Sequence, residues 1–455
     1  MSLYESHVQV FSQPHLHEHR LLNQVKNQDA SNIRPQTYGL GDSSAWDTLA
    51  KWLPYQNANT DWWWKTTGKQ VQVVLENAGY SVSQQYEILL FHYWAVVPRL
   101  GPQPSSIHPQ WRSFMTDDFS PIEYSWKWGM GSDKPEVRYG IEALSPHPGG
   151  KTDPWNQTPT HELLYQLNAT MPGLDLSWYH HFKNFLFNPG TIAASTKKQG
   201  DSSLFLAFEM VRGQISVKAY FIPVETPERS VADQIFAAIK AAPSSNLEAI
   251  HQMESYLKQN PESSSLKPFM IGIDCVSPSK SRLKVYVRSP RTSFNFVRNV
   301  MTLGGLRSGL DDGLDQFDDL WKLTLGLESN YSRDEDLPNR HHTTSGTCFY
   351  FDVAPKSSVP DVKAYIPVRH YARSDRQVGK GLTRFLEKHG RAHFAQGYSN
   401  VVESLATTAG TDATTGVQTY ISCAYQQGQI SMTSYLSPQI YHPARWSPSV
   451  RESLK

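Results

Sequence analysis

The 455-residue chain is long enough for one large domain or for two to three of ordinary size. Hydrophobic residues make up 39% and charged residues 19%, a composition that favours a globular core and excludes a disordered chain. The formal net charge of +1 provides no overall basic field for nucleic acid, so any anion must be bound by a local cluster of cations. Aromatic residues reach 12%, which indicates either a ring-rich core or a cavity lined by π faces.

The three cysteines, Cys275, Cys348 and Cys423, have the spacing of neither a disulfide framework nor a zinc site, which is typical of a reducing compartment. The first residues are polar and do not resemble a signal peptide. No apolar run approaches the roughly 18 residues that a membrane span needs. We therefore expect a cytoplasmic protein that binds neither membrane nor nucleic acid.

Helical patterns dominate the first part of the chain. Residues 1–45 lack periodicity and are predicted to form an N-terminal arm or tail. Apolar residues at helical spacing then predict helices over 61–80 and 84–97, the second ending at Pro98. Further helices are predicted over 163–187, around Val231–Ile239, and over 310–327 and 378–389.

Between these helices the apolar period changes to two, in pairs of strands that indicate hairpins. The predicted pairs are 121–128 with 136–142, 204–211 with 214–222, 269–276 with 282–288, 347–353 with 361–368, and 419–425 with 429–436. A sheet of ten mostly antiparallel strands tends to close and so lose its edges. The pattern predicts an α/β fold in which a ten-stranded barrel encloses a central chamber and helices lie outside. Residues 46–455 are expected to form this single domain.

A Lys-x-Tyr motif recurs on the second strand of three hairpins, as Lys218-Ala219-Tyr220, Lys284-Val285-Tyr286 and Lys363-Ala364-Tyr365. Strand side chains alternate, so each lysine shares a face with its tyrosine. For a single copy, a solvent-exposed face would be the simpler interpretation. Repetition at one place in each hairpin favours a face that points into the barrel.

This inward face is predicted to carry five cations and four tyrosines. The cations would repel one another unless an anion such as a diphosphate bound to them, whereas the tyrosine rings could stabilise a carbocation and exclude water. The predicted cations are Arg138, Lys218, Arg282, Lys284 and Lys363, and the predicted tyrosines are Tyr220, Tyr286, Tyr365 and Tyr435.

Seven short motifs between Trp46 and Pro443 resemble, in order, those of the fungal dimethylallyltryptophan-synthase-type indole prenyltransferases. They are Trp111-Arg-Ser-Phe, Pro121-Ile-Glu-Tyr-Ser, Val137-Arg-Tyr, Val217-Lys-Ala-Tyr-Phe, Arg282-Leu-Lys-Val-Tyr, Leu303-Gly-Gly-Leu-Arg and Val362-Lys-Ala-Tyr-Ile-Pro. The resemblance implies the αββα (ABBA) barrel of that family. It also implies that the five cations bind the diphosphate, that the four tyrosines shield the allyl cation, and that Glu123 accepts the indole N–H and takes its proton.

Two positions refine this interpretation. In the branch that prenylates tryptophan at C4, a lysine is expected thirteen residues before Lys218, where this chain has Phe205. This favours a larger or differently oriented indole acceptor, such as a cyclic dipeptide or an indole alkaloid or terpenoid. The run Asp311-Asp312-Gly313-Leu314-Asp315 matches the magnesium-binding DDxxD motif, but its apolar stripe indicates an amphipathic surface helix.

The sequence therefore predicts an aromatic prenyltransferase of secondary metabolism that transfers a dimethylallyl group from its diphosphate to an indole by electrophilic substitution. The alternative is the same fold acting on a phenolic, xanthone or polyketide ring. We expect no metal or cofactor to be required, and magnesium not to be essential. The expected partners are the two small substrates, and a homodimer is left open.

Overall fold

The computed structural model describes residues 43–194, 202–244, 246–407, 410–426 and 428–446. By their contacts the residues group into two compact units, 1–43 and 44–455, and only the second is described below. Most of the predicted N-terminal arm, residues 1–42, lies outside the described residues. The division into an arm and one domain from residue 46 stays a prediction.

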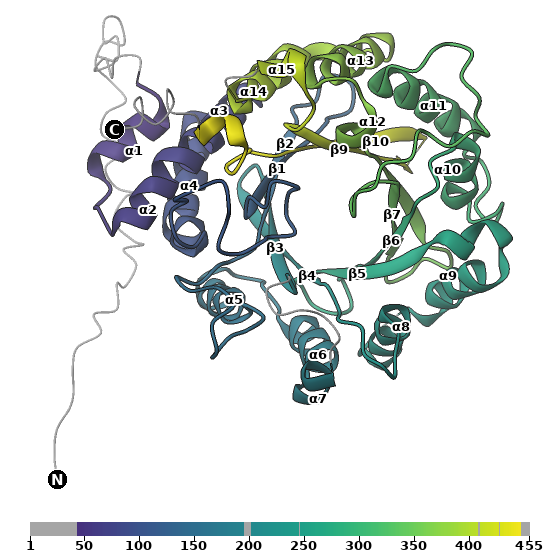
Figure 1. The fold of residues 1–455 in the computed structure, drawn as a ribbon, viewed down its shortest axis with the longest axis horizontal. Helices are drawn as coiled ribbons and strands as arrows, with labels where there is room; N and C mark the ends of the chain where they lie inside the picture. Colours follow the sequence, from purple (N-terminus) through teal and green to yellow (C-terminus); the bar gives the residue numbers. More distant parts are fainter. Residues whose placement is uncertain (1–42, 195–201, 245, 408–409, 427, 447–455) are drawn as a thin grey trace, which may run out of the picture. The chain divides into compact units, whose positions relative to one another are not determined.

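Ten antiparallel strands form a closed barrel, so the predicted architecture is confirmed (Figure 1). Each strand pairs with its neighbour in the chain, and β1 closes the ring by pairing with β10. The strands are β1 (Ile122–Lys127), β2 (Glu136–Ile141), β3 (Leu204–Val211), β4 (Gln214–Phe221), β5 (Lys267–Asp274), β6 (Leu283–Ser289), β7 (Thr347–Val353), β8 (Asp361–Ile366), β9 (Gln418–Gln426) and β10 (Gln429–Leu436).

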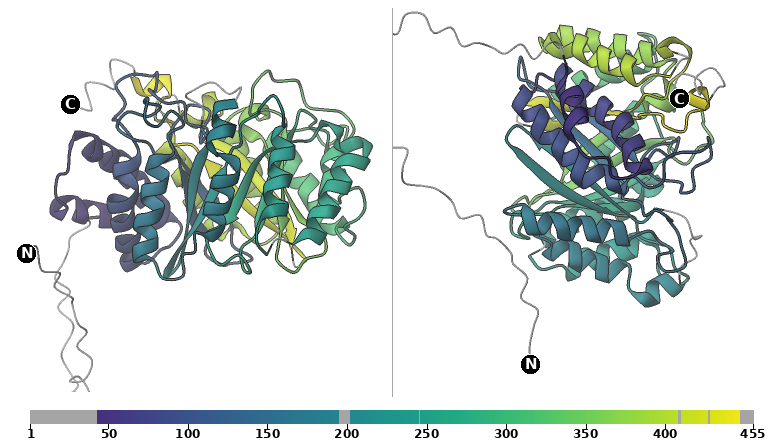
Figure 2. Two further views of the ribbon diagram at one scale, coloured as in Figure 1. Left: turned by 90° about the horizontal axis from the view of Figure 1, so that it is seen from below. Right: turned by 90° about the vertical axis from the view of Figure 1, so that its left-hand side faces the viewer.

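Helices surround the barrel and run alongside its strands (Figures 1 and 2). They are α1 (Ala45–Trp52), α2 (Ala58–Trp63), α3 (Lys69–Asn77), α4 (Val82–Phe91), α5 (Thr158–Thr170), α6 (Ser177–Leu186), α7 (Pro189–Ala194), α8 (Val231–Ala241), α9 (Leu247–Gln259), α10 (Phe294–Met301), α11 (Asp311–Leu325), α12 (Val368–Tyr371), α13 (Asp375–Lys388), α14 (Ala395–Leu405) and α15 (Gly410–Ala413). Within the described ranges, none of these helices has the length and apolar character to cross a membrane.

The prediction of one continuous helix over 163–187 is wrong, because α5 ends at Thr170 and α6 begins at Ser177. The break contains Pro172, which has no amide hydrogen to donate, and Gly173, whose φ is +84°. The helix predicted over 61–80 is instead α2 and α3 joined by a π-helical turn, Trp64–Gly68.

Strand alternation separates two cores. Outward-facing side chains such as Tyr124 and Trp126, both 0% exposed, pack beneath the helices. The inner face carries polar residues and a smaller apolar cluster of Phe205, Ile222, Met270, Tyr286, Cys348 and Tyr365. The apolar shell between barrel and helices therefore holds the fold together, and this leaves the interior free for a binding site.

The acidic run at 311–315 lies on the outside of the barrel, as predicted. It begins α11, where Asp311 and Asp315 are exposed and both pair with Arg298. Leu314 and Phe317 of the same helix are buried. A Cβ on Gly313 would lie 2.1 Å from Cδ2 of Tyr425 on β9, so this glycine lets the helix approach the barrel closely.

This close approach predicts opposite effects of two glycine-to-alanine changes in helix interiors. Gly313→Ala would overpack against Tyr425 and lower the free energy of unfolding by about 1–3 kcal/mol. Gly379→Ala in α13 is the matched control, because a Cβ there meets nothing within 4 Å, and it should stabilise the protein by about 0.4–1 kcal/mol. Urea unfolding followed by circular dichroism measures both changes. Equal stability of the two variants would contradict the packing of α11 described above.

Candidate active site

The barrel brings all five predicted cations to one layer of its interior. Four lie on the second strands of successive hairpins, and Arg282 immediately precedes β6. Lys218 and Lys284 are buried, with only 8% and 3% of their surface exposed. The cations are Arg138, Lys218, Arg282, Lys284 and Lys363, as predicted from the sequence.

Three carboxylates from the first strands complete this layer, and the register places each directly opposite a cation. The cross-strand pairs are Arg138 with Glu209, Lys218 with Asp274, and Lys284 with Asp352. Glu209 lies 2.6 Å from Arg138, and Asp274 lies 2.8 Å from Lys284. Asp352 is 3.2 Å from Arg282.

These carboxylates correct the expectation that the cations would repel one another unless an anion bound. Burial raises the pKa of Glu209, but Arg138 and Lys218 outweigh it and lower the pKa to about 2. The pKa of Asp274 is likewise held below its usual range by Lys284 and Lys218, against burial. Both groups are therefore ionised and offset part of the positive charge of the five cations. The sequence had not indicated these carboxylates, although Asp274 and Arg282 belong to one predicted hairpin and lie 3.0 Å apart.

Lys363 is the exception in this ring. No salt bridge involves it within the part of the chain that the structure describes, and its Nζ lies 5.7 Å from the centre of the Tyr350 ring. On the adjacent strands it faces Tyr350 and Ala424. Burial lowers the pKa of Lys363 to about 7, with a further contribution from Arg138 and Lys218. This cation lacks the negative partner that the others have.

A layer of tyrosines lies next to the charged layer and contains all four predicted residues. Ring centres of successive members are 5.5–6.3 Å apart, from Tyr220 through Tyr286 and Tyr365 to Tyr435. Tyr350 and Tyr420, which the Lys-x-Tyr motif does not include, extend this layer. Burial raises the pKa of Tyr286 and Tyr365 well above the usual value, so these phenols stay neutral. The layer is an array of π faces that excludes water.

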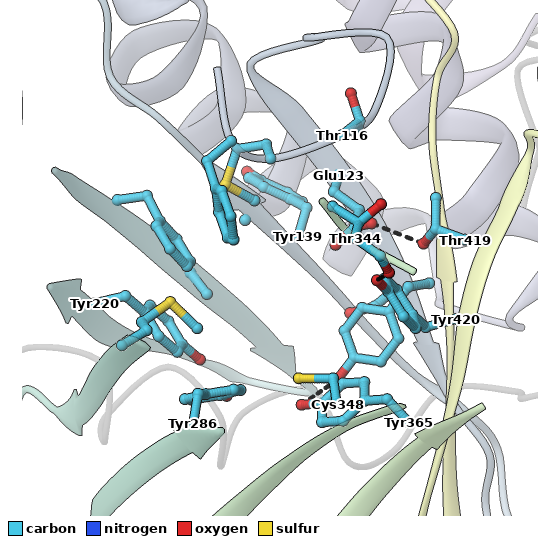
Figure 3. A pocket seen from close by; sticks show the side chains of 18 of the residues that line it. Thr116, Glu123, Tyr139, Tyr220, Tyr286, Thr344, Cys348, Tyr365, Thr419 and Tyr420 are labelled. Atoms are coloured by element: carbon cyan, nitrogen blue, oxygen red, sulfur yellow. Dashed lines mark hydrogen bonds between the residues drawn. The ribbon is translucent and has the colours of Figure 1, made fainter. Parts of the chain in front are cut away.

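Glu123 extends from β1 into the chamber beyond the tyrosines. Its Oε1 accepts a hydrogen bond of 2.8 Å from the Thr419 hydroxyl, drawn as a dashed line in Figure 3. Figure 3 also shows Tyr220, Tyr286 and Tyr365 on the opposite side of the chamber. Burial raises the pKa of Glu123 to about 8, while Thr419 lowers it and Asp117 raises it further. The Glu123 carboxyl group accepts this hydrogen bond from the protein, and its oxygens can accept another from a bound molecule.

The rest of the chamber wall is largely apolar, and its empty volume is about 1110 Å³, counted to its open mouth. Phe205 stacks on Tyr220 with ring centres 4.5 Å apart and planes 6° from parallel. Other apolar side chains of the wall are Phe114, Met115, Phe269 and Met270. Phe114 and Met115 come from an irregular segment. Phe114 ends the motif Trp111-Arg-Ser-Phe, but nothing in the sequence predicted that these two side chains line the chamber.

One cluster in the described ranges has side chains that could coordinate a metal ion. It consists of Asp117, which lines the chamber, with His342 and His370, and the candidate ligand atoms of the three lie within 4.8 Å of one another. Asp117 is already paired with Arg369 at 2.7 Å, and the Thr344 hydroxyl bonds to both Asp117 and His370. These internal contacts account for the arrangement of the three side chains.

The charged layer, the tyrosines and Glu123 follow one another along the barrel. On β6 this order is read directly from Lys284 and Tyr286, which lie two residues apart on the inward face. The arrangement provides cations for an anion, π faces for a short-lived cation, and a carboxyl group that accepts a proton.

Comparison with known proteins agrees with this geometry. The family model described as tryptophan dimethylallyltransferase matches residues 59–401. Prenyltransferase anuH of Penicillium roqueforti is 34% identical, over 89% of this chain and 94% of that protein. Xanthone prenyltransferase B of Emericella nidulans is 32% identical, over 90% of this chain and 95% of that protein.

Solved structures show the same fold. AnaPT from Neosartorya fischeri superposes with a TM-score of 0.75 and 25% identity, over 87% of this chain and 98% of that one. NotF, solved with brevianamide F and DMSPP, gives a TM-score of 0.74 and 22% identity, over 87% and 98% of the two chains. Together with the family match over most of the sequence, the barrel and its contents identify this chain as a member of the tryptophan dimethylallyltransferase family and an aromatic prenyltransferase.

Proposed function

We propose that this enzyme transfers a dimethylallyl group from dimethylallyl diphosphate to a hydroxylated aromatic ring of xanthone or polyketide type, without a metal ion. The observation that carries the proposal is the position of Glu123, across the tyrosine layer from the cation ring in one chamber. Membership of the family supports the reaction class, and this arrangement supports the role proposed for each residue.

The donor occupies the two inner layers. Its diphosphate binds to the five ring cations by charge-assisted hydrogen bonds, and Lys363 contributes the positive charge that no carboxylate of the ring balances. Its alkyl tail lies against Tyr220, Tyr286, Tyr365 and Tyr435. Since the ring itself neutralises the leaving group, no metal is needed for the C–O bond to break.

Bond cleavage leaves both electrons on the diphosphate and gives an allyl cation held by the tyrosine faces. A ring carbon of the acceptor supplies the electron pair of the new C–C bond, while Glu123 takes the proton of the ring hydroxyl. The resulting dienone regains aromaticity when the proton on the alkylated carbon moves to the oxygen. One proton and one diphosphate are released for each transfer.

The relatives favour a phenolic acceptor over the indole that the sequence motifs suggested. Xanthone prenyltransferases A and B resemble this chain over nearly its whole length, whereas solved structures with tryptophan in their names share only 17–21% identity and support the fold alone. Phe205 also occupies the position at which a tryptophan-C4 enzyme is expected to have lysine. An indole stays the second candidate, because its N–H could donate to Glu123 equally well.

The first prediction of this proposal concerns products. Purified protein is incubated with dimethylallyl diphosphate and a panel of xanthones, hydroxynaphthalenes, tryptophan and tryptophan-containing cyclic dipeptides, with EDTA or with magnesium, and product masses are read. We expect a phenolic product heavier by one dimethylallyl unit in EDTA. If only indoles gave products, the phenolic acceptor would be wrong and an indole would replace it. Activity that disappears in EDTA would contradict the metal-free mechanism.

The second prediction concerns Glu123. Replacing a general base typically costs on the order of 10²–10⁴ in rate, so Glu123→Gln should lower turnover by that factor and leave the KM for the donor nearly unchanged. In the native enzyme kcat/KM should rise with pH until about 8, where the pKa of Glu123 lies, and this dependence should be absent from the residual activity of the variant. Unchanged turnover would remove Glu123 from the mechanism.

The third prediction concerns stability. The pKa of Glu123 is raised from 4.5 to about 8 in the folded protein, so its contribution to stability is complete below pH 4.5 and is lost as the pH rises to 8. Glu123→Gln should therefore melt at a higher temperature than the native protein, and the difference should grow between pH 5 and 8 to about 2 °C or more. Above pH 8 the difference should stay constant.

Glu209→Gln is the matched control for the stability measurement. Because ring cations lower the pKa of Glu209 to about 2, its contribution is present above pH 4.5, and its loss should lower the melting temperature at neutral pH. If the two variants respond to pH in the same direction, the opposite charge states assigned to these carboxyl groups are wrong.

A further inference from the structure

Arg288 is a chamber-lining cation that the mechanism above does not use. It lies on β6, two residues beyond Tyr286 and four beyond Lys284, and therefore on the same inward face. Four residues of strand correspond to about 13 Å, which places Arg288 on the far side of the tyrosine layer from the diphosphate ring. It lies at the end of the chamber where the acceptor binds.

The hydrogen-bonding capacity of this guanidinium is only partly used. Arg288 stacks over the Phe269 ring, with 5.0 Å from its Cζ to the ring centre, and its Nη1 donates to the Thr343 carbonyl. Its Nε is buried and has no hydrogen-bond partner, and no ion pair involves Arg288 among the residues that the structure describes. The Cys348 thiol also interacts with the guanidinium, but sulfur is a weak acceptor.

A short series of contacts connects Arg288 to Glu123. Thr419 donates to Glu123, and its neighbour Tyr420 donates to the Thr344 carbonyl at 2.7 Å. Arg288 is anchored on the preceding carbonyl, that of Thr343. Figure 3 shows Thr344 and Tyr420 beside Glu123. Residues 343–344 therefore contact both sides of the chamber end proposed for the aromatic substrate. One side has Glu123, which accepts hydrogen bonds, and the other has Arg288, which donates them.

The other charged groups near this end are already paired. Asp117 is bound by Arg369 at 2.7 Å and accepts a hydrogen bond from Thr344. Glu123 is the other carboxyl group of the wall in this region, and it accepts from Thr419. A planar guanidinium with free donors and no carboxylate of its own is suited to bind a carboxylate or carbonyl oxygen of a ligand.

We propose that Arg288 binds a carboxylate or ring-carbonyl oxygen of the acceptor and so selects aromatic rings that carry such an oxygen beside the hydroxyl that faces Glu123. This inference rests on the proposed transfer to a phenolic ring and specifies its substrate class as hydroxylated aromatic acids and ketones. Arg288 is a specificity-determining residue, since it binds the acceptor at a distance from the carbon that is alkylated.

Two acceptors that differ only in a carboxylate, 2,4-dihydroxybenzoate and resorcinol, provide the test. A charge-assisted hydrogen bond corresponds to about 10- to 100-fold in affinity. Arg288→Met should therefore raise the KM for 2,4-dihydroxybenzoate by that factor and leave the KM for resorcinol and for the donor nearly unchanged. Arg288→Lys should recover part of the loss. Equal increases for both phenols would show that Arg288 only supports the wall and would overturn the proposal.

Arg340→Met is the matched control. Arg340 is exposed, is not part of the chamber wall and lies on the segment that leads to Thr343. Its replacement removes the same charge and should leave both KM values unchanged. If the native enzyme alkylates only indoles, the phenolic acceptor is wrong but Arg288 can still be tested. Tryptophan and tryptamine then replace the two phenols, and Arg288→Met should raise the KM of tryptophan selectively.

Discussion

Closure of the barrel is the constraint on which the rest of this structure depends. Once ten strands close with helices outside, every second side chain must point into an interior shielded from bulk water. Charges there are costly unless they are paired. The chain meets this requirement by placing a carboxylate opposite a cation on neighbouring strands, as with Glu209 and Arg138 or Asp274 and Lys218. Because carboxylates pair with its cations, the site can keep several buried cations without a bound anion.

Among the described residues, neither Lys363 nor Arg288 has a salt bridge to a carboxylate, and the two lie on opposite sides of the tyrosine layer. Lys363 lies on the side proposed for the diphosphate, and Arg288 lies on the side proposed for the acceptor. The paired cations are held in place by carboxylates, whereas the residues opposite Lys363 and Arg288 on the adjacent strands are not acidic.

The sequence predicted the barrel, its hairpins and the five cations of the ring, because strand period and a repeated motif depend on local spacing. Glu123 was indicated by the resemblance of Pro121-Ile-Glu-Tyr-Ser to a family motif. It did not predict Asp352 opposite Lys284, since that pairing joins two different hairpins and its register is set in three dimensions. It also did not predict that Phe114, from an irregular segment, and Arg288, two residues after a Lys-x-Tyr motif, line the chamber. Side chains contributed by long-range pairing and by loops have no periodic signature.

Pairing of β1 with β10 has a consequence for how the protein is made. Glu123 and its partner Thr419 are 296 residues apart, and Trp128 bonds to Ser434 across 306 residues. During synthesis, β1 leaves the ribosome long before its second neighbour, β10, has been made. The edge of β1 that pairs with β10 therefore stays open until the last hairpin emerges. Contacts of such high sequence separation form slowly, so the nascent chain must keep an unpaired strand from associating with other chains. The site is completed in the same event that closes the barrel.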